Sequence, residues 1–169
     1  MPLAKEVPLI VTLKIDEPSR LFFNEKHTIF FPAHANYVDA HVTLFHKLPS
    51  NNLEIEIGMT QFAQHKKFDL LISDIILFAT SVSYTIESPQ LLHLHAEMQS
   101  KFDPYLIRND RKILKPHITI QNKVTPYKAH KTHAFLIKDF NPFVIKAIGF
   151  TRWYYVKGFW KKKEQYLFG

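Results

Sequence analysis

The sequence contains no cysteine among its 169 residues. A chain without cysteine has no disulfide framework, no thiolate nucleophile and no zinc site built on sulfur. It has only four glycines, and no G-x-x-x-x-G-K-[ST] or G-x-G-x-x-G pattern occurs, so the loops that hold ATP or dinucleotides are missing. A G-x-S-x-G elbow is absent as well. These absences disfavour an ATP-dependent ligase and a serine hydrolase.

Long apolar runs are also missing, because no segment approaches the roughly 20 residues that a membrane-spanning helix needs. The first residues, MPLAKEVPLIVTLKID, place Lys5 and Glu6 ahead of an apolar stretch that is shorter than a secretory signal usually has. We therefore expect a soluble, cytoplasmic protein. A chain of 169 residues is expected to form one domain, residues 1–169, and to be a monomer.

The composition is that of a globular protein, with 46% hydrophobic and 14% aromatic residues. Lysine and arginine number 22 against 15 aspartate and glutamate, which leaves a formal charge of +7. Such a surface attracts phosphate-bearing partners over a distance, and more weakly as salt is added.

Alternation, capping residues and β-branched content predict an α+β chain of about seven or eight strands and four helices. Helix starts are marked by polar residues at Ser50 to Asn52, by Ser88 before Pro89, and by Thr125 before Pro126. Strands are expected at 7–16, within 38–47, at 68–80 and 81–88, from 117, and in the aromatic tail 143–168. The tail is expected to turn near Lys157 and Gly158.

One short pattern occurs twice. HVTLFHKLP begins at His41, and HITIQNKVTP begins at His117. Each stretch reads as a strand followed by a helix, so an internal duplication explains the match better than chance does. Two equivalent halves are then expected to face each other.

Side chains alternate along a strand, so His41 and Thr43 share one face, and His117 and Thr119 repeat the arrangement. Two histidines with pKa values near 6.5 can act as base and acid on opposite sides of a phosphorus atom. The threonine hydroxyls can donate to its non-bridging oxygens. A single H-x-T is usually an ordinary strand feature; two copies on matching elements favour a functional pair.

These residues resemble the paired H-x-T/S-x motifs of the two-histidine (2H) phosphoesterase superfamily, above all its RNA 2',5'-ligase and 2',3'-cyclic phosphodiesterase-like members. The resemblance covers most of the chain, including the KPHITIQNKV context. It implies a bilobal α+β fold with a pseudo-twofold pair of antiparallel sheets, helices outside and a central cleft. It also implies chemistry on 2',3'-cyclic phosphates or related phosphodiesters without a metal or other cofactor.

The resemblance further implies that His41 and His117 are the catalytic acid and base, and that Thr43 and Thr119 orient the phosphate. Family analogy leans towards His117 activating water and His41 protonating the leaving ribose oxygen, with a 2'-phosphate as product. Many relatives have Phe-Leu-Gly after the first motif, whereas this chain continues with Phe45-His46-Lys47. That departure leaves the substrate open.

Three further residues are candidates for substrate binding. Lys115 precedes the second motif and either holds a phosphate or belongs to a solvated basic loop. Arg152 and Tyr154 share a face of the tail strand, where relatives place a cation and an aromatic for a base to stack on. His46 is expected to point away from the His41 face if its strand is regular. No metal site is expected, because the other histidines lack suitable partners.

The sequence therefore predicts a phosphodiesterase that acts on a cyclic phosphate at an RNA end or on a small nucleotide. Ligation would be the same chemistry in reverse, with a ribose hydroxyl in place of water. The alternatives are the same site acting on 2',5'-linked oligonucleotides or another cyclic phosphate, and a non-catalytic RNA-binding module.

Overall fold

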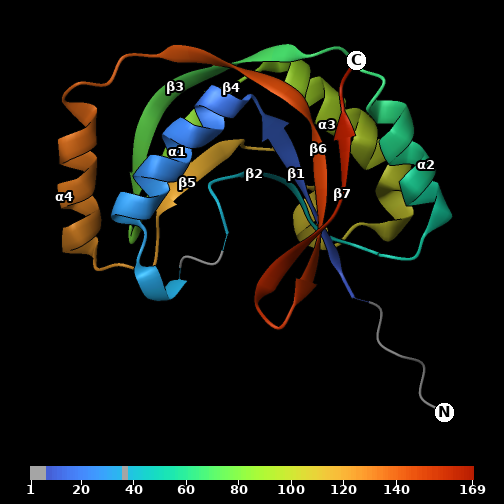
Figure 1. Ribbon diagram of the computed structural model, residues 1–169, viewed down its shortest axis with the longest axis horizontal. Coiled ribbons are helices and arrows are strands. Elements are labelled where there is room, and N and C mark those ends of the chain that lie inside the picture. Colours follow the sequence, from blue (N-terminus) through green and yellow to red (C-terminus); the bar gives the residue numbers. More distant parts are fainter. Residues whose placement is uncertain (1–6, 36–37) are drawn as a thin grey trace.

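The computed structural model describes residues 7–35 and 38–169 and has an α+β fold (Figure 1). Within these residues the helices are α1 (Glu17–Phe30), α2 (Leu53–Phe62), α3 (Pro89–Phe102) and α4 (Pro126–Ile137). The strands are β1 (Leu9–Ile15), β2 (Val42–Leu48), β3 (Phe68–Phe78), β4 (Ser81–Glu87), β5 (His117–Gln121), β6 (Phe143–Val156) and β7 (Phe159–Leu167). Short 3-10 turns lie at η1 (Ala33–Ala35), η2 (Asp103–Tyr105) and η3 (Arg108–Arg111).

All strand pairs are antiparallel, and the order is β2-β1-β6-β3-β4-β5, with β7 also paired to β6. Strand β6 joins the two halves. Its residues 143–147 pair with β3, its residues 149–156 pair with β7, and its other edge pairs with β1. The two expected sheets are therefore the halves of one continuous sheet that share a long central strand.

The sheet curls so that its two ends meet. Strands β2 and β5 stand at opposite ends of the strand order, yet they lie side by side in space (Figure 1). The two repeated stretches are therefore neighbours, as the duplication predicts. The bilobal α+β fold class is confirmed.

Helices α1 and α3 cross between the halves. Helix α1 follows β1 but packs against β5, and α3 follows β4 but packs beneath β2. The ring of His95 on α3 donates from Nε2 to the Leu44 carbonyl at 2.8 Å and stacks on Phe45 with 4.7 Å between ring centroids. Each of these helices follows a strand of one half and packs on the other half. Their packing therefore holds β2 and β5 close to each other.

Each half of the core contains an aromatic cluster. In the half that carries β5, the ring of Phe23 on α1 lies 5.2 Å from Tyr84 and 6.1 Å from Phe143. In the other half, Phe102 lies 6.1 Å from Phe45 and contacts the α2 side through Phe62. Aromatic pairs of this kind add about 0.5–1.5 kcal/mol beyond the burial of their surface.

The expected capping residues start the helices. The side chains of Asn52, Ser88 and Thr125 accept from backbone N–H groups three residues later, at 3.1, 3.2 and 3.2 Å. Each such cap typically contributes about 1 kcal/mol. The turn between β6 and β7 lies where it was expected, with Lys157 and Gly158 at φ of 50° and 83°. None of the helices in the described part of the chain has the length and apolar character needed to cross a bilayer.

Candidate active site

The two repeated histidines are held in the same way. The Nδ1 atom of His41 lies 2.8 Å from the Asp39 carbonyl, and the Nδ1 atom of His117 lies 2.8 Å from the Lys115 carbonyl. A carbonyl oxygen can only accept, so Nδ1 carries the hydrogen in both rings. Nε2 of each ring is then left to exchange a proton with a ligand.

The environment of His41 lowers its pKa. Burial is the largest cause that lowers the pKa of His41 below its ordinary value, and the hydrogen bond to Asp39 acts in the opposite direction. Positive charge on His117, as on His27 and His46, lowers the pKa of His41 further. This electrostatic effect agrees with the side-by-side arrangement of β2 and β5.

The two threonines also occupy matching positions. Thr43 lies opposite Thr12 of β1, and Thr119 lies opposite Ser83 of β4. The hydroxyls of Thr119 and Ser83 are 3.0 Å apart and share a hydrogen bond. The intervening aliphatic residues are buried: Val42, Leu44, Ile118 and Ile120. Alternation therefore places each threonine on the face of its histidine, as expected.

A cavity of about 780 Å³ opens beside His41. Its wall includes Thr12 and Lys14 of β1, Trp153 of β6, and Trp160 and Lys162 of β7. The ring of Trp160 lies 4.6 Å from that of His41 and 6.1 Å from that of Trp153. Flat rings and a lysine next to an imidazole make this a surface on which a nucleobase can stack.

Most of the sequence-predicted residues are not part of that wall. His41 lines the cavity, while Thr43, His117 and Thr119 lie on the two adjoining motif strands. Lys115 contributes its carbonyl to the orientation of His117, and its side chain is exposed to solvent.

The structure places Arg152 and Tyr154 away from the cavity. Arg152 is fully buried, donates to Glu164 at 2.7 Å and lies 3.9 Å from Glu56 of α2. Tyr154 has the Nζ atom of Lys163 5.4 Å from its ring, and this lysine lies 3.6 Å from Glu56. The two residues share a face of β6, as expected, but it is the face that packs towards α2.

The residues of β6 that line the cavity instead are Thr151 and Trp153, which alternate with Arg152 and Tyr154 along the strand. The indole Nε1 of Trp153 donates to Thr12 at 2.9 Å, which fixes the ring against β1. The sequence carries no sign of which face of this strand would be covered, because both faces hold aromatic and charged residues. In the described part of the chain, no three histidine, aspartate or glutamate side chains gather closely enough to hold a metal ion.

Two equivalent histidine–threonine strands that meet across a curled antiparallel sheet are the defining arrangement of a 2H phosphoesterase. The family model of the 2'-5' RNA ligase superfamily matches residues 15–156. The chain therefore belongs to this superfamily.

Solved structures agree with this assignment at the level of the fold. Escherichia coli LigT in complex with 3'-AMP has a TM-score of 0.62 at 16% identity, covering 97% of this chain and 99% of LigT. The protein TT0787 of Thermus thermophilus has a TM-score of 0.66 at 17% identity, covering 95% of this chain and 97% of the other. LigT has also been crystallised with NADP+. No curated protein sequence matches the chain.

Proposed function

We propose that the protein is a metal-independent phosphodiesterase that hydrolyses a 2',3'-cyclic phosphate on an RNA end or a small nucleotide. The observation that carries this proposal is the matched pair His41 and His117, on adjoining strands, each with Nδ1 bound to a carbonyl two residues earlier. One imidazole serves as base and the other as acid. Thr43 and Thr119 donate to the non-bridging phosphate oxygens.

The reaction needs one water. The base takes a proton from the water as its oxygen bonds to phosphorus, and the bond from phosphorus to one ribose oxygen breaks. The acid gives its proton to that ribose oxygen. The product is a phosphate monoester beside a free hydroxyl, and cleavage at the 3' oxygen leaves a 2'-phosphate. Attack on the cyclic phosphate by a ribose 5'-hydroxyl in place of water releases the same ribose oxygen and leaves a 2',5' phosphodiester, which is ligation.

The surroundings of the two rings favour His41 as the base. Burial lowers the pKa of His41, so its ring is neutral at neutral pH and can accept a proton. His117 is exposed to solvent, and it then takes the acid role. This assignment is the reverse of the one that the family resemblance suggested, and it rests on the electrostatics of this chain.

The cavity beside His41 is the proposed place for the nucleoside. Trp153 and Trp160 offer flat surfaces to a base, and Lys14 and Lys162 add positive charge to the same wall. The structures of LigT with 3'-AMP and NADP+ support a nucleotide as ligand for this fold.

The test is turnover of a panel in the presence of EDTA, followed by phosphorus NMR. The panel contains four 2',3'-cyclic nucleotides, a 2',5'-linked dinucleotide and a cyclic phosphate without a base. We expect hydrolysis of the cyclic nucleotides with a 2'-phosphate signal. Preferred cleavage of the 2',5' linkage would instead identify 2',5'-linked oligonucleotides as the substrate of this site. RNA binding without any turnover, unchanged in His41→Ala and His117→Ala, would identify a binding module instead.

A further inference from the structure

His46 lies on the same face of β2 as Thr43, although a regular strand would turn it away. On β1 the residues Val11 and Thr12 are adjacent, but their partners Phe45 and Thr43 are two apart on β2. A second irregularity follows before Leu48. Each irregularity adds one residue to β2 and resets its alternation. A third histidine is thereby added to the face that carries the first motif.

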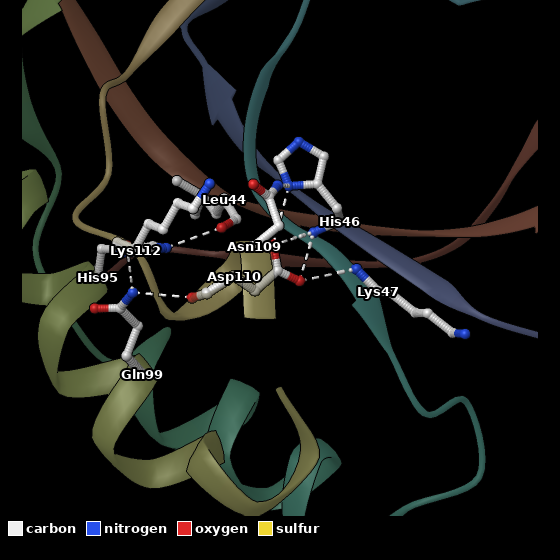
Figure 2. A network of polar contacts seen from close by, with 8 residues as sticks. All are labelled: Leu44, His46, Lys47, His95, Gln99, Asn109, Asp110 and Lys112. Atoms are coloured by element: carbon white, nitrogen blue, oxygen red, sulfur yellow. Dashed lines mark hydrogen bonds and ion pairs between the residues drawn. The ribbon is translucent and has the colours of Figure 1, made fainter. Parts of the chain in front are cut away.

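The ring of His46 is held by a buried carboxylate (Figure 2). Asp110 of η3 has a side chain that is only 1% exposed, and its oxygens accept from Nδ1 of His46 at 2.9 Å. They also accept from the backbone N–H groups of His46 at 2.9 Å and Lys47 at 3.0 Å. Nδ1 therefore donates, and Nε2 lies on the far side of the ring from Asp110. The His46 side chain itself is 59% exposed.

The loop that supplies Asp110 is itself fixed. The side-chain amide of Gln99 on α3 donates to the carbonyls of Asp110 and Lys112, at 2.9 and 2.7 Å (Figure 2). This loop continues into β5, which begins at His117. The buried carboxylate thus joins the His46 strand to the approach of the second motif, and it holds His46 in one orientation. Such preorganisation is typical of a group that binds a ligand.

The position of His46 suits a second anionic group of the substrate. Three residues of a strand span about 10 Å at most, so Thr43 and His46 lie within about 10 Å of each other. They are close enough for neighbouring phosphates of one strand. Because Nδ1 already donates to Asp110, Nε2 of His46 becomes a donor when the ring takes up a second proton. The resulting imidazolium, paired with the carboxylate, is a charge-assisted N–H donor. The exposed Lys47 beside it adds positive charge.

We propose that His46, positioned by Asp110, binds a phosphodiester group next to the terminal cyclic phosphate, so that the substrate is an RNA end rather than a mononucleotide. This inference rests on the proposed function and specifies its substrate class. His46 is a substrate-binding residue here, and Asp110 is a positioning residue.

The experiment compares two substrates, a mononucleoside 2',3'-cyclic phosphate and a trinucleotide that ends in one. In His46→Asn the amide N–H can still donate to Asp110, but the donor at the Nε2 position is lost. We expect kcat/KM to fall about tenfold on the trinucleotide, as for one charge-assisted hydrogen bond, and less than about twofold on the mononucleotide. The matched control is His93→Asn, since His93 also pairs with a carboxylate, that of Glu97, but on the outer helix α3.

A second variant, Asp110→Asn, keeps the shape and removes the charge. It should lower kcat/KM on the trinucleotide by less than His46→Asn does, and the dependence of binding on salt should weaken. Equal losses on both substrates in His46→Asn, or no loss on either, would overturn the inference while hydrolysis by the wild type would still stand.

Failure of the proposed function is recognised separately by binding. Calorimetry measures the affinity of a trinucleotide with a terminal 2'-phosphate and of a mononucleoside 2'-phosphate. If the wild type hydrolyses neither cyclic substrate, weaker binding of the trinucleotide alone in His46→Asn supports the RNA-end site without catalysis. Unchanged binding of the trinucleotide would end the inference as well.

Discussion

The half of the molecule that carries β2 and the half that carries β5 present the same motif in different surroundings. His41 and His117 share their hydrogen bond to a backbone carbonyl. His41, however, is half-buried beside Trp160, whereas His117 is exposed. The duplicated strands thus supply equal groups, and the neighbouring elements make them unequal. In the proposed mechanism the base is neutral and the acid is protonated, and a difference in burial favours such a difference in protonation.

The strands themselves diverge after their threonines. Both gain one residue relative to the neighbouring strand, between Thr43 and Phe45 and between Thr119 and Gln121. Beyond this point β2 turns His46 towards Asp110, while β5 ends at Gln121, whose side-chain amide donates to the Phe30 carbonyl at 3.2 Å. The residues that follow the irregularity therefore have different roles in the two halves. In β5 Gln121 anchors helix α1, whereas in β2 His46 is bound by Asp110.

The largest expected effect comes from replacing the motif histidine of either half. His41→Ala and His117→Ala should each lower kcat on a 2',3'-cyclic nucleotide by about 10²–10⁴-fold, because each removes one partner of the proton transfer. The double variant should be little worse than the single ones, because the two groups act as a unit. Thermal unfolding of each variant verifies that the loss is catalytic. A variant that keeps more than a third of the activity would contradict the two-histidine mechanism.

The threonines test whether both halves contact the phosphate. We expect Thr43→Ala and Thr119→Ala each to lower kcat/KM by about tenfold or more, as for a lost hydrogen bond to a charged group. Ser83→Ala serves as control, because it removes only the bond that orients the Thr119 hydroxyl, and its effect should be smaller. If only one threonine mattered, the symmetry of phosphate binding would be rejected.

The tail strand offers a matched pair on its two faces. Trp153→Ala removes an aromatic from the cavity wall, so the KM for a cyclic nucleotide should rise about fivefold to tenfold with the loss of base stacking. Tyr154→Ala alters the opposite face, so it should leave KM unchanged and lower only the melting temperature. Steady-state kinetics with both variants decide this. The reverse outcome would restore the original expectation for Tyr154.

The smallest expected effect is a shift in the pKa of His41. Because burial and the charge on His117 both lower the pKa of His41, NMR should detect its midpoint below about 6.5. The acidic limb of kcat/KM should follow it, since the base acts in its neutral form. In His117→Gln the charge is absent, so the His41 midpoint should move upwards. A midpoint above the ordinary value would exclude His41 as the more readily deprotonated ring.

Many features of the fold and of the candidate site could be predicted from the local sequence. The capping residues Ser88 and Thr125 fix where two helices start, and strand alternation puts Thr43 with His41, because these features depend only on near neighbours along the chain. The face of Arg152 could not be predicted, since it depends on whether α2 or the cavity covers that side. The position of His46 depends on strand irregularities, which a regular alternation does not reveal.

The sequence by itself determined that two histidine–threonine strands exist, that each is followed by a helix, and that the fold class is α+β. Tertiary structure decided which residues surround them. The curl of the sheet brought β2 and β5 together, and β6 set Trp153 rather than Tyr154 into the cavity. The reason is physical: local propensity and alternation are properties of neighbours in the chain, whereas burial and charge coupling are set by contacts between residues distant in sequence.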